Sequence, residues 1–152
     1  MKTAMVKTSA KENKNQLTVI FKKAFHKQPR SSMDVIEMSK EGVTKGSLMG
    51  FVHFFNFSPD RIAHMLPITL RTIQRYSPKK KFNPTVSEHI IQLALLMVKG
   101  VNVFGSREKF LGWFDTPSAA LGGKAPSELV SLKAGAQLVM DELGRIEYGV
   151  FV

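Results

Sequence analysis

Residues 58–81 read SPDRIAHMLPITLRTIQRYSPKKK and contain the start and stop signals of two short helices. Ser58 is a favourable N-cap before Pro59, and Thr69 is suited to cap a second helix. Pro67, between these two caps, predicts a tight turn because the residue before a proline avoids helical geometry. A short helix, a tight turn and a second helix are typical of a helix-turn-helix.

The second predicted helix has an apolar side, formed by Leu70 and Ile73, and an exposed polar side. The polar side consists of Arg71, Thr72, Gln74 and Arg75. Arg and Gln can form paired hydrogen bonds with guanine and adenine edges, whereas Lys favours phosphates. The basic run that follows directly is Lys79, Lys80 and Lys81. The pattern predicts that the polar side enters the major groove of DNA and that the lysines touch phosphates. The alternative is a helical hairpin whose basic face is merely solvated.

The other periodic segments also predict helices, and the chain contains no Asn-Gly or Asp-Gly hairpin signal. We therefore predict an all-α fold. One long apolar helix opens either at Asn83-Pro84 or at Thr85, which has Glu88 in capping-box register. Residues 100–105 are expected to form a hinge after it. Gly122-Gly123 is expected to form a turn with positive φ angles.

The charge of the chain is unevenly distributed. The 152 residues carry a formal net charge of +10, with 17 Lys and Arg against 6 Asp and Glu in residues 1–99. Residues 100–152 carry 5 against 6. A basic half that meets a polyanion and a near-neutral half with another task would explain this asymmetry. The alternative is that the basic composition only aids solubility.

The sequence offers no enzyme constellation. It has no cysteine, which excludes disulfides, thiolate zinc sites and a Cys nucleophile. The four histidines show no helical pairing typical of metal ligands, and Gly122-Gly123-Lys124 lacks the flanking residues of a phosphate loop. We expect no catalysis, no metal and no cofactor.

No targeting or membrane segment is expected either. Lys2 and Lys7 are not followed by an apolar run, so no signal peptide is predicted. The longest strictly apolar stretch, residues 93–98, is far shorter than the roughly 20 residues that span a bilayer. We expect a cytoplasmic protein without membrane contact.

Several motifs in the C-terminal third occur together. They are Phe104-Gly105, FLGWFDTP at 110–117, ALGGKAP at 120–126 and GRIEYGVF at 144–151. This cluster resembles the toxin-binding domain of Xre/MbcA/ParS-type antitoxins. The segment RTIQR at 71–75, with Asn83-Pro84 and Ser87 after it, is similar to the Xre-like helix-turn-helix of the same family. The resemblance covers roughly residues 34–152, and His89 stands where these proteins often carry Arg.

The resemblance implies an antitoxin of a prokaryotic type II toxin–antitoxin system. Such an antitoxin neutralises a RES-domain toxin, which consumes NAD, by direct contact near the toxin's active-site cleft. It also represses its own operon by binding promoter DNA, where it would be associated with the nucleoid. The residues expected to contact the toxin are Trp113, Arg145, Glu147, Tyr148, Gly149, Val150, Phe151 and Val152.

The predicted organisation has three parts. Residues 1–32 form a flexible basic tail and an extra helix, residues 33–100 an Xre-like helix-turn-helix bundle, and residues 101–152 a small helical toxin-binding domain. A homodimer is expected because helix-turn-helix proteins commonly read two half-sites, and the apolar helix over residues 85–99 is a candidate for its interface. The alternative function is a stand-alone transcription regulator without a toxin partner.

Overall fold

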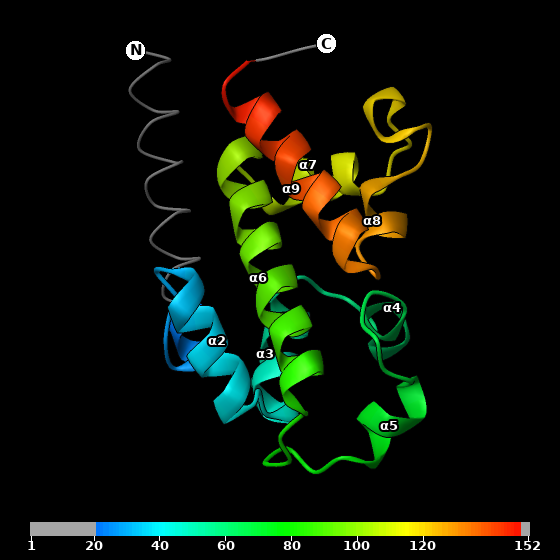
Figure 1. Cartoon of the computed structure of the whole chain (residues 1–152). Helices are drawn as coiled ribbons and strands as arrows, with labels where there is room; N and C mark the ends of the chain where they lie inside the picture. Colours follow the sequence, from blue (N-terminus) through cyan, green and yellow to red (C-terminus); the bar gives the residue numbers. More distant parts are fainter. Residues whose placement is uncertain (1–20, 150–152) are drawn as a thin grey trace. The chain divides into compact units, whose positions relative to one another are not determined.

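The computed structural model describes residues 21–149, which form an all-α structure (Figure 1). The helices are α2 (Ser32–Glu41), α3 (Lys45–Phe54), α4 (Pro59–His64), α5 (Leu70–Arg75), α6 (Pro84–Phe104), α7 (Arg107–Phe114), the 3-10 helix η1 (Ala119–Leu121), α8 (Pro126–Leu129) and α9 (Lys133–Glu147). Residues 21–25 are also helical. Within residues 21–149, extended pairing is limited to two isolated bridges, Thr44 with Lys81 and Ser118 with Lys124. The predicted fold class is confirmed.

Residues 1–20, which include the predicted flexible tail, lie outside the described residues. The described residues divide into two units, 21–94 and 95–149, and α6 contributes residues to both. The three-part organisation expected from the sequence stays a prediction.

Phenylalanine rings form the core of the unit 21–94. Phe21 and Phe25 lie 4.9 Å apart between ring centroids, and Phe25 lies 5.7 Å from Phe51 of α3. Phe51 in turn lies 5.0 Å from Phe55, and all four rings are buried. Burial of large aromatic side chains is the main source of stability in such a core.

The helix α2 begins and ends where the sequence indicates. The Ser31 side chain accepts a hydrogen bond from the Asp34 N–H at 3.2 Å, and Gly42 follows the helix with a φ of 88°. That φ lies in a region that only glycine enters without strain, so Gly42 ends the helix.

The start of α6 is decided by Asn83. Its Oδ1 accepts the Val86 N–H at 2.9 Å, which makes Asn83 the N-cap and Pro84 the first helical residue. Of the two predicted starts, Asn83-Pro84 is therefore confirmed and Thr85 is wrong. The long helix also meets the length and mean hydropathy of a membrane span, but 61% of its most apolar stretch is buried, as is typical of a core helix.

The hinge expected at residues 100–105 is wrong. The helix α6 continues through Gly100 to Phe104, and Gly105, with a φ of 84°, ends it. Gly100 is buried because the Phe110 ring occupies the place where a Cβ would lie. This glycine serves close packing, a role that a sequence pattern does not distinguish from chain flexibility.

The unit 95–149 is closed by α7, α8 and α9, with α8 packed against both of its neighbours. Its fully buried side chains include Leu96, Met97, Phe110, Phe114, Val130, Val139 and Leu143. The turn at Gly122 and Gly123 has φ angles of 69° and 79°, which confirms the predicted role of both glycines. The short helix α8 begins at Pro126 and ends at Leu129.

Candidate functional site

Residues 58–75 fold as two short helices joined by a tight turn, as the sequence predicts. The Ser58 hydroxyl accepts the Arg61 N–H at 3.1 Å at the start of α4. The Thr69 hydroxyl accepts the Thr72 N–H at 3.2 Å at the start of α5. Each cap satisfies a backbone donor that the first turn of a helix leaves without an intrahelical partner.

The two helices pack against each other through a small apolar interface. Ile62 and Ile73 are each only 1% exposed, and Met65 and Leu66 are also buried. Leu70, expected to face inward, is half-buried. Because Ile73 anchors α5, the helix cannot rotate without exposing an apolar side chain, and its polar side keeps a defined direction.

The structure leaves three of the four predicted base-reading residues exposed: Arg71, Gln74 and Arg75. Thr72 differs from the expectation. It is half-buried, and its hydroxyl lies 2.9 Å from the Thr69 hydroxyl in the cap of α5. Thr72 is therefore engaged in the helix start, which the exposed-face pattern did not indicate.

The lysines that follow α5 lie on a loop held by backbone hydrogen bonds. The Pro78 carbonyl accepts the Gly46 N–H at 2.8 Å, and the Lys80 carbonyl accepts the Lys45 N–H at 2.9 Å. The side chains of Lys79, Lys80 and Lys81 are all exposed, with the Lys80 ammonium 5.6 Å from the Tyr76 ring centroid. The loop thus presents these charges from a fixed backbone.

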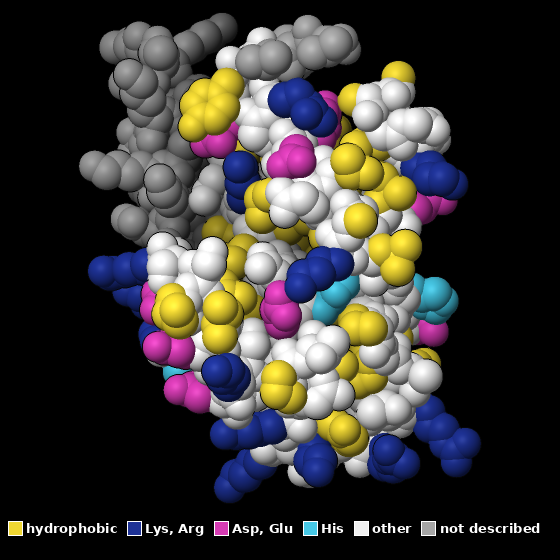
Figure 2. Space-filling view, viewed as in Figure 1, with side chains coloured by type: hydrophobic (Ala, Val, Ile, Leu, Met, Phe, Trp, Pro, Cys, Tyr) yellow, Lys and Arg dark blue, Asp and Glu magenta, His cyan; other side chains and the backbone are white. Residues whose placement is uncertain are grey.

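Lysine and arginine side chains gather over α5 and the loop that follows it (Figure 2). Two further basic residues, Lys45 and Arg61, make contacts in this region. The Lys45 ammonium donates to the Tyr76 carbonyl at 2.8 Å, and the Arg61 guanidinium lies 4.4 Å from the Phe57 ring centroid. No local sequence motif predicts the contact of Lys45, because its partner Tyr76 lies 31 positions further along the chain.

In the unit 95–149, Trp113 belongs to an aromatic cluster. Its ring centroid lies 5.4 Å from that of Phe104 and 6.2 Å from that of Phe110, and the residue is half-buried. A toxin could touch only part of this ring, because the rest already packs within the unit.

Ion pairs and exposed groups surround the last turns of α9. The Arg145 Nε donates to the Glu142 carboxylate at 2.8 Å, and the Lys99 ammonium lies 3.9 Å from the Glu147 carboxylate. Tyr148 is 80% exposed. Lys99 was not predicted to take part, since its partner is far along the chain and no motif joins the two.

A shallow depression of about 430 Å³ lies at the same place. It is lined by Lys99, Met140, Asp141, Gly144, Arg145 and Tyr148. The structure therefore brings Arg145, Glu147, Tyr148 and Gly149 together at the end of α9, while the predicted contacts Val150, Phe151 and Val152 lie outside the described residues.

Across residues 21–149, no three His, Asp or Glu side chains form a group that could hold a metal ion. The pKa of Glu108 is lowered by a backbone N–H at the start of α7 and by the adjacent Arg107 guanidinium. Glu108 is exposed and lies outside the two candidate surfaces described above.

Comparison with known proteins places the C-terminal unit in a family. Residues 99–149 match the family described as the antitoxin Xre/MbcA/ParS C-terminal toxin-binding domain. A protein named antitoxin Xre from Yersinia enterocolitica is 38% identical over 72 residues, which are 47% of this chain and 49% of that protein. A second antitoxin Xre, from Photorhabdus laumondii, is 31% identical over 96 residues, which are 62% and 65% of the two chains. The chain thus spans about half to two thirds of the length of the curated relatives it matches.

A solved structure shares the fold. One chain of the crystal structure of the M. tuberculosis MbcT-MbcA toxin-antitoxin complex aligns with a TM-score of 0.53 at 18% identity. The alignment covers 71% of this chain and 96% of that chain. Residues 99–149 are thus similar to the C-terminal toxin-binding domain of Xre/MbcA/ParS antitoxins, and the chain is similar over a larger part of its length to two proteins named antitoxin Xre.

Proposed function

We propose that this protein is an antitoxin that binds and neutralises a cognate toxin through residues 99–149 and binds its own promoter DNA through α4 and α5. The observation that carries the proposal is the match of residues 99–149 to a toxin-binding domain. Both tasks are binding tasks, and neither requires a catalytic group. The site of action would be the cytoplasm, where toxin and promoter meet.

For the toxin contact, we propose the end of α9 and the segment after it. The exposed Tyr148 ring supplies an apolar anchor, and Glu147 supplies a carboxylate. The proposed partner is a RES-domain toxin that consumes NAD. A pocket for a dinucleotide phosphate needs cationic side chains, and Glu147 could pair with one of these by exchanging its contact with Lys99.

For the DNA contact, we propose that Arg71, Gln74 and Arg75 reach base edges while Lys79, Lys80 and Lys81 touch phosphates. The capped, anchored α5 and the loop held by α3 support this assignment. A dimer would place two such helices on two half-sites of the promoter.

Deletion of residues 147–152 tests the two halves of the proposal against each other. The deletion removes Glu147, Tyr148 and the residues after them but leaves most of α9, so the fold and promoter binding should persist. The truncated protein should fail to protect cells that express the toxin. Glu147→Gln should weaken protection less, because an amide still accepts a hydrogen bond.

The measurement is survival of cells that co-express the toxin encoded beside this gene with each variant. Circular dichroism confirms folding, and a gel shift confirms promoter binding. If the folded truncation protects as well as the intact protein, the inhibitory contact lies elsewhere, and Trp113 becomes the residue to test. The absence of a toxin gene beside this one would favour a stand-alone regulator.

A further inference from the structure

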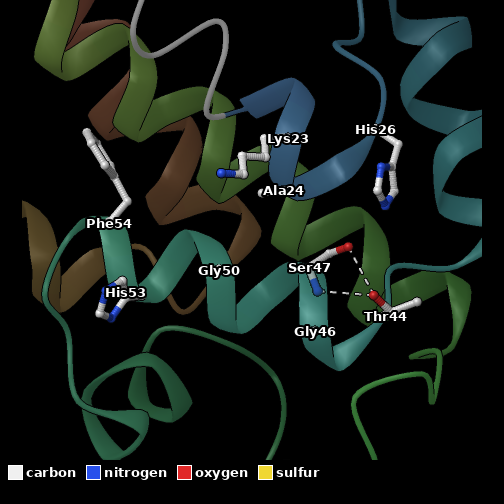
Figure 3. A pocket seen from close by; sticks show the side chains of 9 residues that line it. All are labelled: Lys23, Ala24, His26, Thr44, Gly46, Ser47, Gly50, His53 and Phe54. Atoms are coloured by element: carbon white, nitrogen blue, oxygen red, sulfur yellow. Dashed lines mark hydrogen bonds between the residues drawn. The ribbon is translucent and has the colours of Figure 1, made fainter.

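A cavity of about 510 Å³ lies between residues 23–26 and one side of α3 (Figure 3). Its volume falls within the range of about 300–1,000 Å³ that is usual for small-molecule sites. None of the surfaces assigned above to toxin or DNA includes the side chains that give this cavity its chemistry, which are Lys23, His26, Ser47, His53 and Phe54.

The hollow is open beside Gly50 of α3, which faces residues 23–26, whereas a Cβ added at Gly46 would meet the Pro78 carbonyl oxygen at 3.1 Å. Gly46 and Gly50, one helical turn apart, both line it. A Cβ added at Gly50 would meet only the Cβ of Ala24, at 3.9 Å. The space beside Gly50 is therefore open and is not filled by the packing of the described residues.

The side chains around the cavity are basic. Lys23, His26 and His53 line it, and no Asp or Glu does. Within residues 21–149, none of these three side chains takes part in an ion pair or a side-chain hydrogen bond. A concave surface that carries a lysine ammonium and two imidazoles but no carboxylate favours an anionic ligand.

The two ends of the cavity differ in chemistry (Figure 3). Thr44 and Ser47 lie at the end nearer His26, and the Thr44 hydroxyl donates to the Ser47 hydroxyl oxygen at 3.0 Å. The Ser47 proton is therefore available for an anion. Phe54 lies at the other end, and its ring meets Phe55 edge to face, with centroids 5.0 Å apart and planes at 89°.

We propose that this cavity binds a small molecule that carries a phosphate group and an aromatic ring, of the size of a nucleoside monophosphate. Lys23, His26 and the Ser47 hydroxyl contact the phosphate through charge-assisted hydrogen bonds. The ring of the ligand packs on Phe54, since stacking on an aromatic side chain accepts any base.

Titration of the full chain by calorimetry tests the proposal with three probes: adenosine monophosphate, adenosine and inorganic phosphate. The monophosphate should bind at least about tenfold more tightly than either fragment, because only it reaches both ends of the cavity. Equal affinity for adenosine and its monophosphate would overturn the anionic assignment. Failure of the four common nucleoside monophosphates to bind below about 1 mM would overturn the site.

Variants locate the binding. Lys23→Ala should weaken the binding of adenosine monophosphate about tenfold. Lys22→Ala is the matched control, since Lys22 is the exposed neighbour in the chain and does not line the cavity. Gly50→Leu should fill the hollow and abolish binding while circular dichroism shows the helical content unchanged. Equal losses for Lys22→Ala and Lys23→Ala would show diffuse attraction to a basic surface and would contradict the proposal.

The phosphate could instead belong to the backbone of duplex DNA, and a competition experiment separates the two sources. We expect that a duplex of unrelated sequence does not displace the monophosphate and that Gly50→Leu binds promoter DNA as the parent does. Displacement by the duplex, together with weaker promoter binding of Lys23→Ala, would assign the cavity to DNA and overturn the small-molecule proposal. Because promoter binding and toxin protection are measured separately, loss of nucleotide binding alone leaves the antitoxin function intact.

Discussion

Gly100 and Gly135 stand where any other residue would collide with a neighbour. A Cβ at Gly100 would overlap the Phe110 ring, and one at Gly135 would overlap the Leu129 carbonyl oxygen. Both neighbours are held in place, Phe110 by full burial and Leu129 by its position at the end of α8. These two glycines therefore set how closely α7 approaches α6 and how closely α9 approaches α8.

Gly100→Ala should lower the free energy of unfolding by about 1–3 kcal/mol, the usual cost of adding a methyl group to a packed core. Gly112→Ala is the control, because Gly112 is a helical glycine of α7 with no atom within 4 Å of an added Cβ. It should be neutral or stabilise by up to about 1 kcal/mol, since alanine loses less entropy on forming a helix. Urea denaturation measures both changes, and an equal effect of the two substitutions would contradict the packing role.

Arg75→Ala should weaken binding of the chain's own promoter by about 1–3 kcal/mol if the side chain pairs with a guanine edge. The loss of affinity should be largest for the natural promoter sequence. It should be smaller for a promoter in which the base pair contacted by Arg75 has been changed. Lys109→Ala removes the same charge from an exposed position of α7 and serves as the control. A quantitative gel shift compares them, and equal losses for both variants would mean that Arg75 contributes only charge.

The helix α5 spans only Leu70–Arg75, and a helix this short has little stability of its own. Two features outside its own hydrogen bonds hold it, namely the Thr69 cap and the burial of Ile73. The polar side can be presented to DNA only while both are intact.

Thr69→Ala should therefore destabilise the protein by about 0.5–2 kcal/mol and should also reduce promoter affinity. Thr69→Ser should restore both properties, because a serine hydroxyl accepts the same Thr72 N–H and adds no charge beside the DNA. Thermal unfolding and gel shifts on the three proteins provide the measurement. Full promoter affinity in a destabilised Thr69→Ala protein would show that α5 does not need its cap to meet DNA.

The uneven charge along the chain matches the division of labour that we propose. Replacing Lys79, Lys80 and Lys81 by Ala should weaken binding to all DNA sequences and flatten the dependence of affinity on salt. The slope of log affinity against log salt should fall by about one unit for each phosphate contact that is lost. Protection against the toxin should be unchanged, because that task is assigned to residues 99–149. An unchanged slope would remove the lysine run from the DNA interface.

The amino-acid sequence alone was sufficient for the features that depend on neighbours within about four positions. The sequence predicted the caps Ser58 and Thr69 and the turn at Gly122-Gly123, and the structure has all three. The all-α class follows from the same local patterns. The resemblance to the antitoxin family also rests on short contiguous motifs, which is why the sequence carries it.

Features that join distant positions emerged only from the folded chain. The Phe110 ring occupies the space beside Gly100, and the Glu147 carboxylate pairs with the Lys99 ammonium. The cavity beside Gly50 needs residues 23–26 to fold against α3. A sequence pattern states which side of a helix is apolar, but not which residue of another helix fills the space beside it. That choice is made by the packing of all the elements together, since each side chain excludes the others from its own volume.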